Sequence, residues 1–270
     1  MRVALAQLTS GPRPEDNLAL VEEWTARAAE AGASLVVFPE ATMAWFAADP
    51  ATTAEETDGP WAAEVAAIAR RHQLTVAVGM FTRAEDPSTG SGGRSAKVRN
   101  TLLLTDGTAH HRYHKIHLFD AFGHRESDTV SPGTQTLQLT LGTWPTGVAI
   151  CYDLRFGELF TGYADAGAEL LLVSASWGAG AGKLEQWRTL STARALDTTC
   201  WVIACDQAEP QGEQVGTAPL GVGHSMVVDP LGRIVAEAGA GPELLVVDLD
   251  HDLVGQARRA LPVLDNAALR

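Results

Sequence analysis

The sequence has few cysteines, few basic residues and no long apolar run, and each shortage argues against a class of protein. Three cysteines among 270 residues, Cys151, Cys200 and Cys205, do not make a disulfide framework, and so sparse a count favours a reducing compartment, the cytoplasm. They include no Cys-x-x-Cys pair, which argues against a structural zinc site. No apolar run approaches the roughly 18 residues that a membrane span requires. The formal net charge of −13 argues against nucleic-acid binding, because nucleic-acid binders usually carry a basic face.

What the sequence does contain is typical of one folded domain. Hydrophobic residues make up 46% and charged residues 20% of the chain, as in ordinary globular proteins. Neither a repeat of fixed period nor a clear boundary divides the chain, so a single domain over residues 1–270 is expected. The stretch from Arg83 to Lys97 is rich in glycine and serine and is expected to form an exposed hairpin loop.

Hydrophobic periodicity predicts strands that alternate with helices along the chain. The predicted strands are 3–8, 35–38, 74–81, 100–105, 108–113, 135–141, 146–150, 170–174, 201–205, 224–228, 234–237 and 244–249. The predicted helices are 17–31, one that opens at 59–61, 157–166, 183–196 and 252–259. Alternating strands and helices, mixed with antiparallel hairpins, predict an α/β fold with mixed sheets.

Three reactive side chains each follow a predicted strand. Cys151 and Glu40 come directly after buried apolar strands, and Lys115 lies just beyond a β-hairpin. Ligand sites of open α/β sheets commonly lie at the carboxyl ends of the strands. A thiol, a carboxylate and an amine are therefore expected to meet at one site.

These three groups suit acyl transfer. The thiolate is the reactive form of cysteine, and the start of a helix after Cys151 is expected to favour it. Glu40 is expected to take the thiol proton and to return it later to a leaving amine. The charge of Lys115 and the backbone N–H of Tyr152 suit a developing oxyanion. The predicted reaction is amide hydrolysis through a thioester, and it requires neither a metal nor an organic cofactor.

Three motifs together resemble the carbon–nitrogen hydrolase (nitrilase) superfamily, and the resemblance covers almost the whole chain. They are Phe38-Pro39-Glu40, His114-Lys115-Ile116-His117-Leu118-Phe119 and Ile150-Cys151-Tyr152-Asp153-Leu154-Arg155-Phe156. The glutamate, lysine and cysteine of the family fall on Glu40, Lys115 and Cys151. A second glutamate that is frequent in the family falls on Glu126, and the resemblance implies that it orients the lysine and helps to position the amide.

This resemblance implies a four-layer α-β-β-α sandwich with two mixed sheets, which forms a homodimer through its helical faces or a higher homo-oligomer. The branch that the chain resembles most contains ω-amidases and deaminated-glutathione amidases, which implies a small linear amide carrying a carboxylate as substrate. Thr198-Thr199 and Phe46 depart from that branch, and the tail after Asn266 lacks its usual pair of arginines. These departures leave the substrate open and do not involve the catalytic residues.

Several other residues have two interpretations each. Phe46, Tyr152 and Trp177 either line a substrate pocket or fill the core, because aromatic residues do both. Arg188 and Arg194 either meet a substrate carboxylate or form ordinary salt bridges, which is the more common case.

The remaining cysteines and the histidines are expected to play no part in the chemistry. Cys200 and Cys205 are interpreted as inert core residues. Four histidines resemble a metal cluster, but no further ligand set accompanies them, so no metal is expected. They are His110, His111, His114 and His117.

The leading hypothesis is an amidase acting on a small linear carboxamide, with no nucleic-acid or membrane partner. The candidate substrates are an ω-amide of a 2-oxo acid and deaminated glutathione. A nitrilase is the alternative within the same class, because the same three groups also attack a nitrile carbon. Two alternatives from other classes are a non-catalytic binding scaffold and a thiol redox sensor built on Cys151. A scaffold has no need of all three groups, and a sensor needs a resolving partner.

Overall fold

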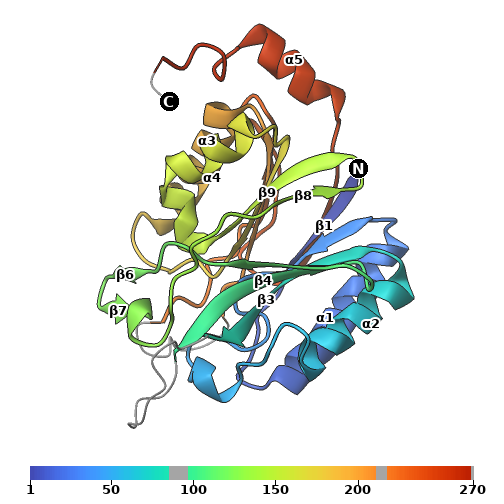
Figure 1. Ribbon diagram of the computed structural model, residues 1–270, viewed down its shortest axis with the longest axis vertical. Helices are drawn as coiled ribbons and strands as arrows, with labels where there is room; N and C mark the ends of the chain where they lie inside the picture. The colour runs from blue at the N-terminus through green and yellow to red at the C-terminus, as the bar shows by residue number, and fades with distance from the viewer. Residues whose placement is uncertain (85–96, 211–217, 269–270) are drawn as a thin grey trace.

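A computed structural model describes residues 1–84, 97–210 and 218–268. The loop expected between Arg83 and Lys97 lies mostly outside these ranges. Within them the chain forms two six-stranded mixed sheets, and helices cover the outer face of each sheet (Figure 1). This arrangement is the four-layer α-β-β-α sandwich that the resemblance implies.

The first sheet has the strand order β14-β1-β2-β3-β4-β5. Its middle strands β1, β2 and β3 run parallel, and the strands on either side pair antiparallel to their neighbours. The bounds are β14 (Glu243–Asp248), β1 (Arg2–Gln7), β2 (Leu35–Val37), β3 (Thr75–Arg83), β4 (Val98–Thr105) and β5 (His110–His114).

The second sheet repeats this plan with the order β13-β12-β11-β10-β9-β8. Here β9, β10 and β11 run parallel in the middle, and the outer pairs are again antiparallel. The bounds are β13 (Ile234–Glu237), β12 (Met226–Val228), β11 (Trp201–Asp206), β10 (Leu170–Ala175), β9 (Trp144–Ile150) and β8 (Gln138–Leu141).

The helices form the two outer layers. Helices α1 (Pro14–Glu30) and α2 (Pro60–His72) pack on the first sheet, and α3 (Gly157–Asp165) and α4 (Lys183–Thr198) pack on the second (Figure 1). Helix α5 (Asp252–Ala260) follows the last strand and lies at the top of Figure 1. Short 3-10 helices span Pro50–Thr52, Glu126–Asp128 and Cys151–Arg155.

Some observed element ends differ from the predicted ones. Helix α1 begins at Pro14 and not at residue 17, because the fixed φ of proline suits the first turn of a helix. Strand β8 begins at Gln138 and not at residue 135. A small hairpin of β6 (Asp120–Ala121) and β7 (His124–Arg125) was not predicted, since two-residue strands are too short to show a periodic pattern.

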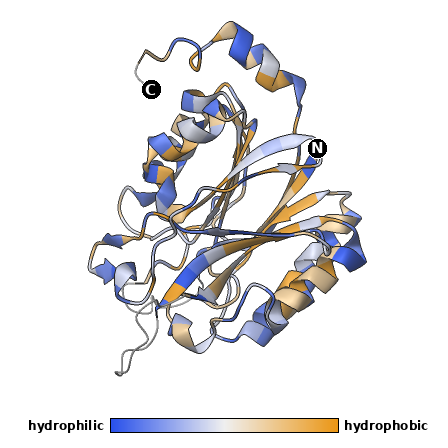
Figure 2. Ribbon diagram, in the orientation of Figure 1, coloured by the Kyte–Doolittle hydropathy of each residue, from blue (hydrophilic) through white to orange (hydrophobic). Residues whose placement is uncertain are grey.

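Alternate residues of the central strands face different cores. In β1, Val3 and Leu5 pack between the sheets, whereas Ala4 and Ala6 pack against α1 and α2. All four side chains are fully buried. Strands that are buried on both faces require nearly continuous apolar sequence. Figure 2 shows the result, with strands mostly in hydrophobic colours and outer helices that carry both colours.

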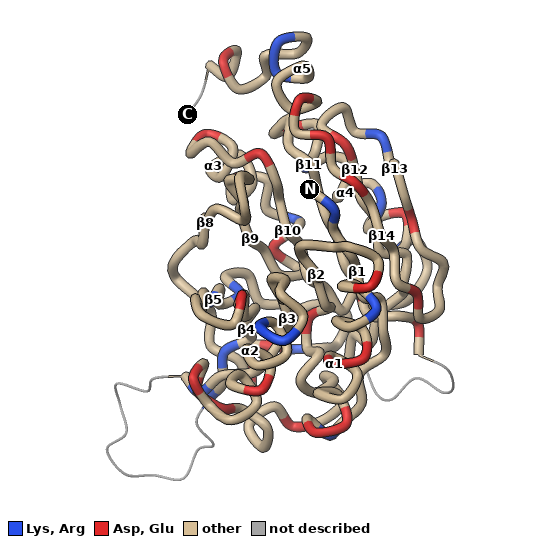
Figure 3. Tube along the Cα trace, turned by 90° about the vertical axis from the view of Figure 1, so that its right-hand side faces the viewer, with Lys and Arg blue, Asp and Glu red and all other residues tan. Residues whose placement is uncertain are grey.

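Charged residues lie mainly around the periphery of the molecule, and the middle strands are largely free of them (Figure 3). Within residues 1–84, 97–210 and 218–268, no helix is long and apolar enough to span a membrane.

The turn that follows β2 fits closely against β3. The N–H of Gly79 donates to Pro39 O at 3.2 Å, and the N–H of Met43 donates to Gly79 O at 2.9 Å. A Cβ on Gly79 would lie 2.5 Å from the backbone nitrogen of Ala41 and 2.6 Å from Pro39 O. Such short contacts with backbone atoms are not relieved by a side-chain rotation, so this position requires glycine.

Gly79→Ala is therefore expected to destabilise the protein by roughly 1–3 kcal/mol, because the added methyl group forces the backbone of residues 39–41 to move. Gly162→Ala on α3 is the matched control. Apart from its chain neighbours and the backbone of its own helix, no described heavy atom lies within 4 Å of its Cβ position, and alanine favours a helix over glycine by roughly 0.5–1 kcal/mol. Urea unfolding measures both changes. Equal stability of Gly79→Ala and the wild type would contradict the packing described here.

His114, the last residue of β5, is half-buried and neutral. Its Nδ1 lies 2.8 Å from Thr101 Oγ1. Burial, and then the charges of Arg99 and Arg112, lower the pKa of His114 to about 4. Because an unfolded histidine titrates near pH ~6.5, the unfolded chain binds more protons than the folded chain between about pH 4 and pH 6.5. Stability therefore falls as the pH drops through this window.

We expect His114→Gln to weaken this pH dependence. Between pH 7.5 and pH 5.5 the titration of His114 removes up to about 1 kcal/mol from the wild-type free energy of unfolding, and the variant lacks this loss. Urea unfolding of both proteins at the two pH values provides the comparison. If the two proteins differed in stability by the same amount at both pH values, His114 would not be the neutral buried group that we describe.

Candidate active site

Glu40 lies in the turn after β2, and several hydrogen bonds fix its backbone. Its N–H donates to Ala175 O at 3.2 Å, and Gln207 Nε2 donates to Glu40 O at 2.9 Å. The next residue, Ala41, has a φ of 56°, a left-handed conformation that costs roughly 1–2 kcal/mol for a residue with a Cβ. The buried carboxylate accepts the N–H of Ser176 at Oε2, at 2.8 Å. The turn thus holds the acid in one orientation.

Lys115 follows β5 directly, and two buried carboxylates share its ammonium group. Lys115 Nζ lies 2.8 Å from Glu40 Oε1 and 2.8 Å from Glu126 Oε2. No side chain of the three is more than 2% exposed. Glu126 Oε2 also accepts the N–H of Phe119 at 2.7 Å, which ties this carboxylate to the segment after Lys115. The structure therefore brings together three residues that the sequence motifs had singled out separately.

Asn100 on β4 bridges the same two carboxylates. Its Nδ2 donates to Glu40 Oε1 at 2.7 Å and to Glu126 Oε1 at 2.9 Å. Its backbone oxygen accepts the N–H of Lys115 at 2.9 Å. The sequence analysis missed this residue. The available signal was an asparagine just ahead of the apolar run in strand Val98–Thr105.

Cys151 occupies a sharp turn at the end of β9. Its φ of 48° is unusual for a residue with a side chain, and such strain is often found at functional sites. The Sγ atom is buried and lies 3.8 Å from Ser176 O. Cys151–Arg155 form a 3-10 helix, and α3 begins only at Gly157. The helix predicted from residue 157 is therefore confirmed, and a 3-10 helix begins at the cysteine.

Burial is the largest influence on the pKa values of the thiol and of the charged groups beside it. Burial raises the pKa of the Cys151 thiol well above its ordinary value, and the negative charge of Glu40 raises it further, against the opposing effect of Lys115. Burial and the charge of Glu126 raise the pKa of Glu40, although Lys115 and Asn100 lower it. Burial alone would lower the pKa of Lys115, but the two glutamates hold it well above its usual range. The resting site therefore combines a neutral thiol with a charged lysine.

Asp153 joins the chain on both sides of Lys115 to the end of β9. Its buried carboxylate accepts Tyr113 Oη at 2.7 Å, the N–H of His117 at 2.9 Å and the N–H of Ile150 at 3.0 Å. The ring Nδ1 of His117 lies 2.7 Å from the same carboxylate. The sequence analysis did not predict that Asp153 connects these segments.

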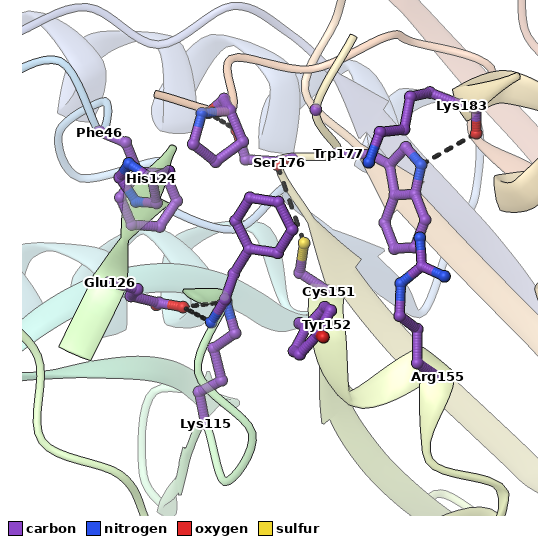
Figure 4. A pocket seen from close by; sticks show the side chains of 13 residues that line it. Phe46, Lys115, His124, Glu126, Cys151, Tyr152, Arg155, Ser176, Trp177 and Lys183 are labelled. Carbon is purple, nitrogen blue, oxygen red and sulfur yellow. Dashed lines mark hydrogen bonds and ion pairs between the residues drawn. The ribbon is translucent and has the colours of Figure 1, made fainter. Parts of the chain in front are cut away.

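An enclosed pocket adjoins Cys151 (Figure 4). The predicted pocket residues Phe46, Tyr152 and Trp177 all line it, whereas Glu40 is not in the wall and contacts the wall residue Lys115. The complete lining is Phe46, Lys115, Phe119, His124, Glu126, Cys151, Tyr152, Arg155, Ser176, Trp177, Gly178, Lys183 and Pro219. The residues proposed from the sequence for catalysis and for the pocket walls therefore lie in this pocket or directly beside it.

The two arginines considered for a substrate carboxylate do not line the pocket. Arg188 Nη2 lies 2.6 Å from Glu237 Oε1, and Arg194 Nη2 lies 3.2 Å from Asp197 Oδ2. Both are engaged in ion pairs, as the simpler interpretation predicts.

Cys200 and Cys205 are buried, and their sulfur atoms face backbone carbonyl groups. The four histidines of the sequence cluster do not converge, since His110 and His111 are exposed on β5, and the rings of the other two contact Thr101 and Asp153. In the ranges that the structure describes, no group of three His, Cys, Asp or Glu side chains is placed to hold a metal ion.

The chain has close relatives among known proteins. A protein of Mycobacterium tuberculosis described only as a hydrolase is 47% identical over 275 residues, which cover 98% of this chain and 95% of the relative. A deaminated glutathione amidase of Synechocystis is 34% identical over 274 residues, which cover 97% of this chain and 96% of the relative.

Among solved structures, an amidase of the nitrilase superfamily from Nesterenkonia AN1 has a TM-score of 0.78 and 28% identity, and the match covers 96% of this chain and 94% of that one. A mutant of that amidase shows covalent addition of the acetamide moiety of fluoroacetamide at its active-site cysteine. The family model for carbon–nitrogen hydrolases matches residues 2–259 of the present chain. The chain therefore belongs to the carbon–nitrogen hydrolase family, as its three motifs predict, and is a hydrolase that acts on carbon–nitrogen bonds.

Proposed function

We propose that the protein is an amidase that hydrolyses a small linear carboxamide to a carboxylate and ammonia through a thioester on Cys151. The single observation that carries the proposal is the buried ion cluster beside the cysteine. In it, Lys115 lies 2.8 Å from each of two glutamates, Glu40 and Glu126, and shares a pocket with the thiol.

In the proposed acylation, Glu40 takes the proton of the Cys151 thiol as the sulfur attacks the amide carbon. A neutral resting thiol needs such a base, and the raised pKa of Glu40 makes it a stronger one. Negative charge then develops on the amide oxygen, where the ammonium of Lys115 and the N–H of Tyr152 stabilise it. When the carbon–nitrogen bond breaks, Glu40 returns the proton to the leaving nitrogen, and a thioester remains.

In the proposed deacylation, Glu40 takes a proton from water, and the hydroxide formed attacks the thioester carbonyl. The same two donors stabilise the second oxyanion. The carbon–sulfur bond breaks, Glu40 returns its proton to the thiolate, and the product acid leaves and gives its own proton to solvent as it becomes a carboxylate. Glu126 and Asn100 do not transfer protons in this scheme. They hold Lys115 and Glu40 in place.

The comparisons support the amide class and suggest a substrate. A relative of 34% identity is a deaminated glutathione amidase, and a structural neighbour forms a covalent adduct on its active-site cysteine. We therefore include deaminated glutathione and ω-amides of 2-oxo acids among the proposed substrates. Phe46, Tyr152 and Trp177 are proposed as the walls against which the substrate packs. The homodimer and the cytoplasmic location stay predictions.

The test is an activity screen combined with trapping of the intermediate. The screen covers ω-amides of 2-oxo acids, deaminated glutathione, simple aliphatic amides and the matching nitriles, and detects ammonia or the released amine. Intact-protein mass spectrometry of a rapidly quenched reaction detects an acyl group on Cys151. Turnover of nitriles but not of amides would favour a nitrilase. Neither turnover nor a covalent adduct with any compound would favour a binding scaffold.

Cys151→Ala is expected to reduce turnover to background and to leave the fold intact, because the side chain is small and no other thiol lines the described pocket. Steady-state kinetics and the thermal unfolding midpoint provide the two measurements. Cys200→Ala is the matched control, since it removes a buried thiol outside the pocket and is expected to keep wild-type kcat. Turnover by Cys151→Ala near the wild-type rate would contradict the thioester scheme.

Lys115→Ala is expected to lower kcat by about 10²–10³-fold, the range seen when an oxyanion donor is removed from other hydrolases. KM is expected to change much less, because the contact with the oxygen strengthens only in the transition state. The substitution also leaves Glu40 and Glu126 facing each other without a cation, which raises the pKa of the pair. Kinetics across a pH series measure both effects, and a kcat close to the wild-type value would exclude the proposed role.

A further inference from the structure

A second lysine lies in the same pocket as Cys151, and the proposed reaction makes no use of it. Lys183 is the first residue of α4, lines the pocket and is only 8% exposed. The chain contains three lysines in all, at positions 97, 115 and 183. Figure 4 shows Lys115 and Glu126 on one side of Cys151, and Lys183 with Arg155 on the other. The pocket therefore has two cationic ends with the thiol between them.

The two ends differ in how their charge is compensated. The ammonium of Lys115 is neutralised by Glu40 and Glu126, each 2.8 Å away. The ammonium of Lys183 lies 3.6 Å from the ring centre of Phe122 and 5.7 Å from that of Phe119. In the described part of the chain, no acidic side chain forms an ion pair with it. Burying an unpaired ammonium is costly, and two aromatic faces repay only part of that cost.

The neighbours of Lys183 add to the positive charge. The guanidinium of Arg155 lies 5.1 Å from the ring centre of Trp177, and its Nη2 donates to Gln186 Oε1 at 2.6 Å. Burial, followed by the charge of Arg155, lowers the pKa of Lys183. The N-terminus of α4, which begins at Lys183, carries a partial positive charge of its own. This end of the pocket thus has uncompensated positive charge in a protein whose net charge is −13.

We propose that Lys183 binds the anionic group of the substrate, so that the enzyme selects linear amides with a carboxylate at the end remote from the scissile bond. This inference rests on the proposed amidase function. The carboxylate ion-pairs with the ammonium of Lys183, the chain of the substrate lies along the aromatic walls, and the amide carbon reaches Cys151. Pairing inside the enclosed pocket gives orientation as well as affinity, since a reversed substrate would place its carboxylate beside Glu126.

A structural role for Lys183 makes a different prediction. Its contact with Phe122, a residue that is 74% exposed, joins α4 to the hairpin of β6 and β7. If Lys183 served only to hold that hairpin, its removal would weaken the binding of neutral and anionic amides equally. The charge of the substrate therefore separates the two roles.

The experiment compares glutaramate with pentanamide, which have a carboxylate and a methyl group at the same position of the chain. Binding to Cys151→Ala protein is measured by calorimetry, with and without Lys183→Met, so the result does not depend on turnover. The steady-state kinetics of both amides are then measured for Lys183→Met in the protein that retains Cys151. Arg27→Met is the control, since Arg27 is an exposed cation stacked on Trp24, at 4.3 Å, on the surface of α1.

Lys183→Met is expected to weaken glutaramate binding roughly 10- to 100-fold, the usual effect of losing a charged hydrogen bond, and to leave pentanamide binding within about twofold. Lys183→Arg is expected to restore most of the preference, and Arg27→Met is expected to have no effect. Equal losses for both amides, or a wild-type protein without preference for glutaramate, would overturn the proposal. A preserved preference without turnover of any amide would support the anion site and refute the amidase function.

Discussion

One ammonium group shared by two buried carboxylates is the interaction on which the site depends. Glu40 and Glu126 both lie within reach of Lys115, and neither has access to bulk water. Burying an ion costs several kcal/mol, and two adjacent anions repel each other. Lys115 offsets both effects, and Asn100 together with the N–H groups of Ser176 and Phe119 satisfies the remaining oxygens. Burial, and then the charge of Glu40, raise the pKa of the neighbouring thiol, which stays neutral until a base acts on it.

The site exists because two sheets pack face to face. Glu40 and Lys115 belong to segments that leave the first sheet, whereas Cys151 and Ser176 follow strands of the second. Ser176 links the two halves, since its N–H binds Glu40 and its oxygen lies beside the thiol. Asp153 makes a second link between the segments around β5 and β9. The strained backbone conformation of Cys151 is maintained because these hydrogen bonds hold the turn in place.

The two ends of the pocket differ in charge, and this difference sets the orientation of the proposed substrate. At one end the lysine is neutralised and can act only on charge that develops during the reaction. At the other end Lys183 retains its charge for a ligand, with aromatic rings around it. Arg188 and Arg194, which the sequence suggested for a carboxylate, are occupied by Glu237 and Asp197. The spacing of residues along a helix does not by itself distinguish an arginine that forms an ion pair from a lysine that lines a pocket.

The sequence by itself determined the family and the layered α/β fold, and it singled out Glu40 and Cys151 as candidate site residues, because apolar strands followed by a carboxylate or a thiol are local patterns. Only the tertiary structure decided which other groups surround those residues and set their protonation states. The sequence analysis assigned no role to Asn100, Asp153 or Lys183, although Asp153 lies within the third motif. The importance of Asn100 and Asp153 comes from partners 26 to 60 positions away. That of Lys183 comes from its place in the pocket without an acidic partner among the described residues. The protonation state of the thiol also depends on the tertiary structure. Burial and the charge of a glutamate from the other sheet set the state of the thiol, and both arise only when the sheets pack.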